Sequence, residues 1–215
     1  MNSPQAVEIE TGPDPRAAVI WLHGLGADGH DFEPIVPELE LAAPVRFVFP
    51  HAPVQPVTLN QGMRMRAWYD IYQLGGGPED DAGIRASQKL VESMIAAEKK
   101  RGAQKLVLAG FSQGGAVVLQ TALRHPERLA GVLALSTYLP LPATLAAERS
   151  AANRDLPIFM AHGAYDDVIP LARAEQSRRI LEGLGYAVQW QVYPMPHSVC
   201  PEEIAHLSQF LGRIL

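Results

Sequence analysis

The sequence predicts an α/β fold, with a mostly parallel central sheet and helices on both of its faces. Short runs of continuously apolar residues recur along the chain and are typical of strands buried on both faces. Between them lie segments with apolar residues at helical spacing, and this alternation favours parallel pairing of the strands. No internal repeat or low-complexity linker interrupts the pattern, so residues 1–215 are expected to form a single domain without a large lid.

The composition excludes several classes of protein. With 47% hydrophobic and 19% charged residues, we expect a soluble globular protein of the cytoplasm. A net charge of -5 without a basic tract makes nucleic acid an unsuitable partner. No apolar run approaches the ~18 residues of a membrane span, and the first residues do not resemble a signal peptide. The single cysteine, Cys200, can form neither an intramolecular disulfide nor a metal cluster.

The first third of the chain contains three predicted strands and one long loop region. Ala6–Glu10 alternates like an edge strand, and the wholly apolar Ala17–Leu22 predicts a buried strand that ends in a glycine-rich loop. A helix is predicted from Asp31 to Leu39, before a third strand at Val45–Phe49. Residues 51–79 show no clear periodicity, and their aromatic and methionine content favours an ordered, packed segment.

The rest of the chain repeats strand and helix. Residues 84–100 place apolar side chains at helical spacing, with Gly102 just past the end. A segment rich in proline and alanine, residues 138–154, separates two later strands. Further strands are predicted at 106–109, 131–136, 157–163 and 188–193, and further helices directly after Gly115, at 171–184 and at 201–215.

The sequence Gly110-Phe111-Ser112-Gln113-Gly114 lies between an apolar strand and a helix. A turn this tight forces Ser112 towards a positive φ, and glycines on either side remove β-carbons that would collide. The alternative is a glycine-rich loop with an incidental serine, but the flanking strand and helix favour a nucleophile elbow. Ser112 is therefore the candidate nucleophile.

A base and an acid for this serine are expected at other strand ends, because functional residues in open α/β sheets lie there. Of the seven histidines, His197 directly follows the last predicted strand. Asp166 follows the strand before it, so the chain order is serine, acid, histidine, as in α/β-hydrolases. Asp167 is the reserve for the acid, and either aspartate could instead cap the helix that begins near Leu171. For His197 the alternative is an ordinary loop histidine.

The negative oxygen of a tetrahedral intermediate requires hydrogen-bond donors. The amide of Gln113, at the start of a helix, is one candidate. The amide of Leu25, in the loop His23-Gly24-Leu25-Gly26, is the second, because glycines allow this backbone to turn its amides inward. The alternative for this loop is a tight turn without catalytic purpose.

Motifs spread along the chain carry a resemblance to a known family. They are His23-Gly24-Leu25-Gly26, Phe49-Pro50-His51-Ala52-Pro53, Val57-Thr58-Leu59-Asn60, Ala67-Trp68-Tyr69-Asp70-Ile71, Gly110-Phe111-Ser112-Gln113-Gly114-Gly115, His162-Gly163 with Asp166, and His197-Ser198-Val199-Cys200. From about residue 18 to its end, the chain resembles the phospholipase/carboxylesterase family of α/β-hydrolases. The resemblance implies a triad of Ser112, Asp166 and His197, with Leu25 and Gln113 as oxyanion donors and no metal or cofactor.

The resemblance also implies an acyl groove beside the elbow. Its predicted lining residues are Leu59, Met63, Met65, Trp68, Tyr138, Leu139 and Leu141. We expect a serine carboxylesterase that hydrolyses short to medium acyl esters, which are small-molecule substrates. Acyl-protein thioesterase or lysophospholipase activity with the same triad is the alternative, and a non-catalytic ligand-binding protein of this fold is an alternative from another class. The family resemblance also suggests a homodimer.

Overall fold

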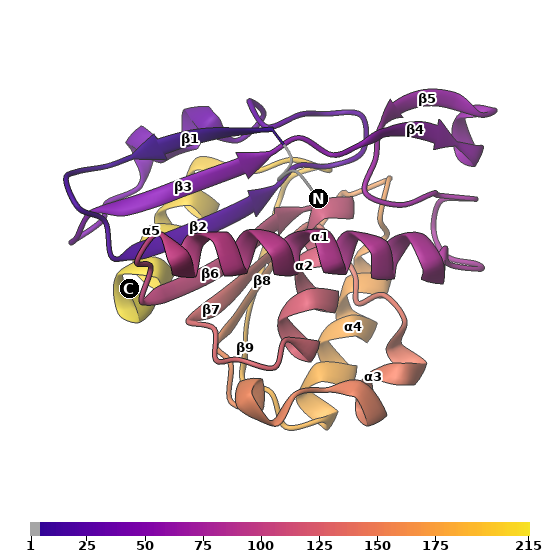
Figure 1. The fold of residues 1–215 in the computed structure, drawn as a ribbon. Coiled ribbons are helices and arrows are strands. Elements are labelled where there is room, and N and C mark those ends of the chain that lie inside the picture. Colours follow the sequence, from indigo (N-terminus) through magenta and orange to yellow (C-terminus); the bar gives the residue numbers. More distant parts are fainter. Residues whose placement is uncertain (1–4) are drawn as a thin grey trace.

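The computed structural model describes residues 5–215 and has a central seven-stranded sheet covered by helices (Figure 1). The strand order is β1-β3-β2-β6-β7-β8-β9, and only β1 is antiparallel to its neighbour. The strands are β1 (Ala6–Glu10), β2 (Ala17–Leu22), β3 (Val45–Pro50), β6 (Lys105–Phe111), β7 (Gly131–Leu135), β8 (Ile158–Gly163) and β9 (Val188–Tyr193). This sheet confirms the α/β class predicted from the apolar runs.

Helices cover both faces of the sheet. The helices are α1 (Asp81–Lys100), α2 (Gln113–Arg124), α3 (Pro142–Glu148), α4 (Leu171–Gly183) and α5 (Pro201–Ile214). Alternate residues of β2 enter different cores: Ile20 belongs to the cluster that contains side chains of α1, α2, α3 and α4, whereas Trp21 belongs to the cluster that contains side chains of α5. Because both faces are covered, β2 is apolar throughout instead of alternating.

The first region that differs from expectation precedes β3. Instead of a helix over residues 31–39, the chain forms a shorter 3₁₀ helix, η1 (Glu33–Glu38). Two of its residues, Pro34 and Pro37, have no amide hydrogen to donate, so the longer hydrogen-bond ladder of an α-helix cannot form.

A hairpin within residues 51–79 is the second difference. Strands β4 (Val54–Val57) and β5 (Met63–Arg66) pair antiparallel, joined through the 3₁₀ helix η2 (Thr58–Asn60). Each strand has only four residues, which is too short for an alternating pattern to be recognised in the sequence. The segment is ordered, as its composition indicated.

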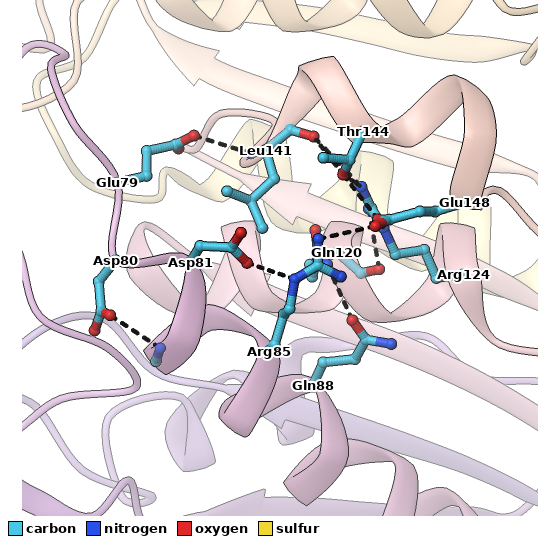
Figure 2. A network of polar contacts seen from close by, with 11 residues as sticks. Glu79, Asp80, Asp81, Arg85, Gln88, Gln120, Arg124, Leu141, Thr144 and Glu148 are labelled. Atoms are coloured by element: carbon cyan, nitrogen blue, oxygen red, sulfur yellow. Dashed lines mark hydrogen bonds and ion pairs between the residues drawn. The ribbon is translucent and has the colours of Figure 1, made fainter.

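Residues 138–154 are also ordered, and a polar network fixes α3 against α1 and α2 (Figure 2). The Glu148 carboxylate accepts hydrogen bonds from Arg124 Nε at 2.7 Å and from Arg85 Nη2 at 2.9 Å. The hydrogen bond from Arg124 is the main reason that the pKa of Glu148 falls to about 2. Arg124 also contacts the carbonyl of Leu141, whose φ of 45° is rare outside glycine. The network therefore holds the strained turn at which α3 begins.

The carboxyl ends of β2, β6, β8 and β9 lie at one edge of the parallel sheet. The loops after these four strands carry the oxyanion candidate, the elbow serine, the acid and the histidine. Residues far apart in the sequence are thus brought to one edge by parallel pairing alone. None of the helices within residues 5–215 combines the length and apolar character needed to cross a membrane.

Candidate active site

Ser112 occupies the sharp turn between β6 and α2. Its φ of 54° and ψ of -119° confirm the positive φ predicted for the elbow. The turn is held from both sides, since Ser112 N donates to Leu135 O at 2.9 Å and Thr137 Oγ1 donates to Ser112 O at 2.6 Å. A β-carbon on Gly114 would lie 2.4 Å from Leu22 O, so glycine is required where α2 approaches β2.

The structure brings Asp166 and His197 into contact. Asp166 Oδ2 accepts a hydrogen bond from His197 Nδ1 at 2.6 Å, and its side chain is buried. The other carboxylate oxygen accepts from the amides of Val168 at 2.9 Å and Ile169 at 2.8 Å. Because Nδ1 carries the shared proton, His197 Nε2 is left as the acceptor. The neighbouring Asp167 is exposed.

A second histidine lies behind this pair. His162 Nε2 donates to Ile169 O at 2.8 Å and lies 3.3 Å from Asp166 Oδ2. Burial lowers the pKa of His162, which favours the neutral ring. The adjacent Gly163 has no room for a side chain, because a β-carbon would lie 2.4 Å from Met195 O in the loop before His197. These contacts hold the loops of the acid and the base together.

The imidazole of His197 lies against the residue that precedes the serine. The ring of Phe111, the residue before Ser112, packs on His197 with 4.7 Å between ring centroids. Within residues 5–215, no hydrogen bond joins Ser112 Oγ to His197. Such a bond is often long in an enzyme without substrate and shortens in the reactive complex. Sequence reasoning missed Phe111, whose position inside the elbow motif was the available signal.

The two predicted oxyanion donors belong to segments that adjoin Ser112. Gln113 begins α2, so its amide has no acceptor within the helix. The loop carrying Leu25 adjoins the elbow: a β-carbon on Gly24 would lie 3.4 Å from Ser112 Cβ. In the described part of the chain the amide of Gly26 donates a hydrogen bond to Arg66 O, whereas the amide of Leu25 has no acceptor. Neither amide has an acceptor among residues 5–215, as a donor to an oxyanion requires.

Three of the predicted groove residues line a hollow on the β4–β5 hairpin. Leu59, Met63 and Met65 border this open hollow of about 710 Å³. It adjoins the oxyanion loop, because Met65 Sδ lies 3.9 Å from where a β-carbon would stand on Gly26. A larger hollow of about 840 Å³ lies between the end of β1 and η1, and no predicted site residue borders it.

The other predicted groove residues are not on this surface. Trp68, Tyr138 and Leu139 are only 2%, 8% and 4% exposed, and Leu141 packs partly buried beside them. Tyr138 Oη bonds to Tyr69 Oη at 2.8 Å inside the core. These side chains thus present little surface on which an acyl chain could lie, although the sequence predicted them in the groove. Trp68, Tyr138 and Leu139 belong to the core cluster that also contains side chains of α1 and α2.

The Gln113 side chain has a role that sequence reasoning missed. Its Oε1 accepts from Trp68 N at 2.8 Å, and its Nε2 donates to Tyr69 O at 2.7 Å. The residue after the serine thus ties the segment after the hairpin to the elbow. A polar side chain at a fully buried helix start was the only sequence signal for this contact. No group of three or more metal-ligating side chains is found within residues 5–215.

A mostly parallel sheet that presents an elbow serine, an acid and a histidine, in that chain order, defines a serine hydrolase of the α/β-hydrolase fold. The sequence profile of the phospholipase/carboxylesterase family matches residues 4–215, and the chain belongs to this family. It is an enzyme that hydrolyses ester bonds.

Individual relatives cover nearly the whole chain. It is 41% identical to acyl-protein thioesterase 1 of Gibberella zeae, over 93% of this chain and 91% of the relative. Acyl-protein thioesterase 1 of Mycosarcoma maydis is 40% identical, over 97% and 95% respectively. Among solved structures, Arabidopsis thaliana SOBER1 (28% identical, TM-score 0.87) covers 92% of this chain and 98% of its own. Zea mays acyl-protein thioesterase 2, also 28% identical with a TM-score of 0.87, covers 97% and 99%.

Proposed function

We propose that this enzyme is an acyl-protein thioesterase, which hydrolyses the thioester between an acyl chain and a cysteine side chain of a protein. The observation that carries the proposal is its similarity to two relatives of that name across at least 91% of every chain compared. This activity is the alternative considered from the sequence, and the relatives favour it over general hydrolysis of short to medium esters. The hollow beside the loop that carries Leu25 supports it, because Leu59, Met63 and Met65 on its border offer apolar surface to an acyl chain.

The first half of the proposed reaction transfers the acyl group to Ser112. His197 Nε2 takes the proton of Ser112 Oγ as that oxygen attacks the thioester carbonyl carbon. The carbonyl electrons move to oxygen, giving a tetrahedral oxyanion. When they return, the C–S bond breaks, and the departing sulfur takes the proton from the imidazolium. Asp166 keeps His197 Nδ1 protonated and stabilises the positive ring, through the 2.6 Å hydrogen bond.

The second half releases the acid. Water gives one proton to His197 Nε2 and attacks the acyl carbon, and the resulting oxyanion collapses with cleavage of the C–O bond to Ser112. The serine oxygen then takes the proton back, which restores the enzyme. The amides of Leu25 and Gln113 would stabilise both oxyanions, a contribution worth several kcal/mol for such donors. The hollow bordered by Leu59, Met63 and Met65 would hold the acyl chain throughout.

Hydrolysis of matched substrates tests the proposal. Purified enzyme is given an S-acylated peptide, the O-acyl serine peptide of the same sequence and chain length, a lysophospholipid, and p-nitrophenyl esters of increasing length. We expect kcat/KM to be highest for the S-acylated peptide. Ser112→Ala should abolish turnover and labelling by a fluorophosphonate probe, which reacts with activated serines.

Two results would contradict the proposal in different ways. Fast turnover of short p-nitrophenyl esters with no cleavage of the S-acylated peptide would restore the general carboxylesterase. Absence of fluorophosphonate labelling in folded wild-type protein would instead support a ligand-binding protein without catalysis. A Thr137→Val variant tests the elbow separately, because it removes only the hydroxyl that holds the Ser112 carbonyl.

A further inference from the structure

Two side chains fix consecutive carbonyls of the loop after β2. Trp68 Nε1 donates to His23 O at 2.9 Å, and His23 Nδ1 donates to Gly24 O at 2.7 Å. In a trans peptide the C=O and the following N–H point in opposite directions within one rigid plane. A bond to Gly24 O therefore sets the direction of the Leu25 amide, which has no acceptor among residues 5–215.

The His23 ring can make this bond in only one tautomer. Its Nε2 accepts a hydrogen bond from Ala52 N at 3.1 Å, so Nε2 carries no proton and Nδ1 must carry it. The side chain is 2% exposed, and burial lowers the pKa of His23, which favours this neutral ring. His23 also contacts the Trp68 ring, with 5.3 Å between centroids. The hydrogen bond from Ala52 N to Nε2 thus holds the His23 ring in the orientation in which Nδ1 donates to Gly24 O.

Trp68 is itself fixed to the elbow. Its amide donates to Gln113 Oε1 at 2.8 Å, and its carbonyl accepts from Ser87 Oγ on α1. The indole is 2% exposed, so it contributes through its N–H and its packing and has almost no surface for substrate. One chain of hydrogen bonds consequently runs from Gln113 through Trp68 to the carbonyl of His23. It links the two predicted oxyanion donors through side chains.

We propose that His23 and Trp68 are positioning residues of the oxyanion hole: the indole and imidazole N–H groups hold two successive carbonyls so that the Leu25 amide faces the oxygen above Ser112. This inference rests on the proposed function, because it assigns the oxyanion donors used there. Donors aimed in advance stabilise the transition state more than the bound substrate. Loss of either support should therefore lower kcat with little change in KM.

Two matched tryptophan variants test the proposal. Trp68→Phe keeps an aromatic ring but removes the N–H that bonds to His23 O. Trp21→Phe is the control, because Trp21 is equally buried at 1% exposure and its Nε1 has no hydrogen-bond partner in the described chain. We expect Trp68→Phe to lower kcat and the rate of fluorophosphonate labelling by about tenfold or more, short of the roughly 10²-fold or greater loss of a donor itself. Trp21→Phe should leave both unchanged.

A histidine pair gives an independent measurement if Trp68→Phe does not fold. His23→Asn places an amide N–H near the position of Nδ1, whereas His23→Leu has no donor. We expect His23→Asn to recover kcat relative to His23→Leu at similar KM, with thermal unfolding confirming that both variants are folded. A purely structural role for His23 would make activity follow stability instead of the presence of the donor.

The inference and the proposed function fail in distinguishable ways. Wild-type kcat and labelling rate in folded Trp68→Phe would overturn the inference, as would equal kcat in the two folded His23 variants. A wild-type enzyme that reacts with the fluorophosphonate but does not cleave the S-acylated peptide would overturn the proposed substrate instead. In that case p-nitrophenyl butyrate and the labelling rate still measure the oxyanion hole.

Discussion

Asp166→Asn is the sharpest test of the candidate triad, because it changes one atom of the side chain that holds His197. The amide oxygen of asparagine can continue to accept from the amides of Val168 and Ile169, now 2.9 and 2.8 Å away. The amide nitrogen then replaces Oδ2, which lies 2.6 Å from His197 Nδ1. Since that nitrogen donates, Nδ1 must accept, and the ring proton moves to Nε2. The imidazole then cannot take the serine proton.

The expected loss follows from this change of tautomer. A triad with the wrong imidazole tautomer loses on the order of 10⁴-fold in kcat. At about 1.36 kcal/mol for each factor of ten, this equals roughly 5 kcal/mol of transition-state stabilisation. The loop itself should remain folded, because the two amide bonds to the carboxylate are retained. The assay is the steady-state kcat for S-acylated peptide, with the thermal midpoint measured on the same preparation.

Asp167→Asn is the matched control, because it makes the same chemical change at the adjacent, exposed position. We expect its kcat to remain within a few-fold of wild type. The reasoning would be refuted if Asp167→Asn caused the large loss and Asp166→Asn did not. It would also be refuted if Asp166→Asn lost activity only in proportion to unfolded protein.

Three further predictions concern stability. Burial lowers the pKa values of His23 and His162 from 6.5, so near that pH the unfolded chain binds protons that the folded chain does not. The urea concentration at the midpoint of unfolding should therefore fall as the pH drops from 7 through 6.5. Burial raises the pKa of Glu203 to about 8, so between its ordinary value of 4.5 and 8 unfolding releases a proton. Glu203→Gln should therefore raise the thermal midpoint at pH 7, with the gain vanishing near pH 4, and an equal gain at both pH values would contradict this account. Gly163→Ala should lower the free energy of unfolding by about 1–3 kcal/mol and also lower kcat, because the new β-carbon would lie 2.4 Å from two carbonyl oxygens of the loop before His197. Gly183→Ala is the control, and it should change neither quantity, because a β-carbon there meets open space.

Local sterics determined the parts of the site that the sequence could predict. The elbow at Ser112 was recognisable because a strand, a tight turn and a helix in sequence leave few conformations open, and its φ of 54° follows from that crowding. The order of Asp166 and His197 after it was informative because parallel strands place their carboxyl ends at one edge. The same rule separated His197 from the other histidines.

Contacts across the fold decided which of the predicted groove residues are buried and which lie at the surface. Trp68 and Tyr138 were expected in the groove, yet both are buried and hydrogen-bonded inside the loops. Leu59 and Met63, with the same kind of sequence signal, lie at the surface because the β4–β5 hairpin carries them out of the core. The sequence does not distinguish an apolar loop residue that packs in the core from one that binds a ligand. The residues that surround it in the folded structure make this distinction.

The sequence by itself determined the fold class, the elbow and the order of the acid and the base, since each depends on local geometry or on parallel pairing. Only the tertiary structure decided that Asp166, and not Asp167, bonds to His197, because adjacent side chains point in different directions. It also decided that His23, adjacent to a recognisable glycine loop, holds Gly24 O. Hydrogen bonds such as these join segments brought together by folding, and their direction depends on atoms that no local pattern records.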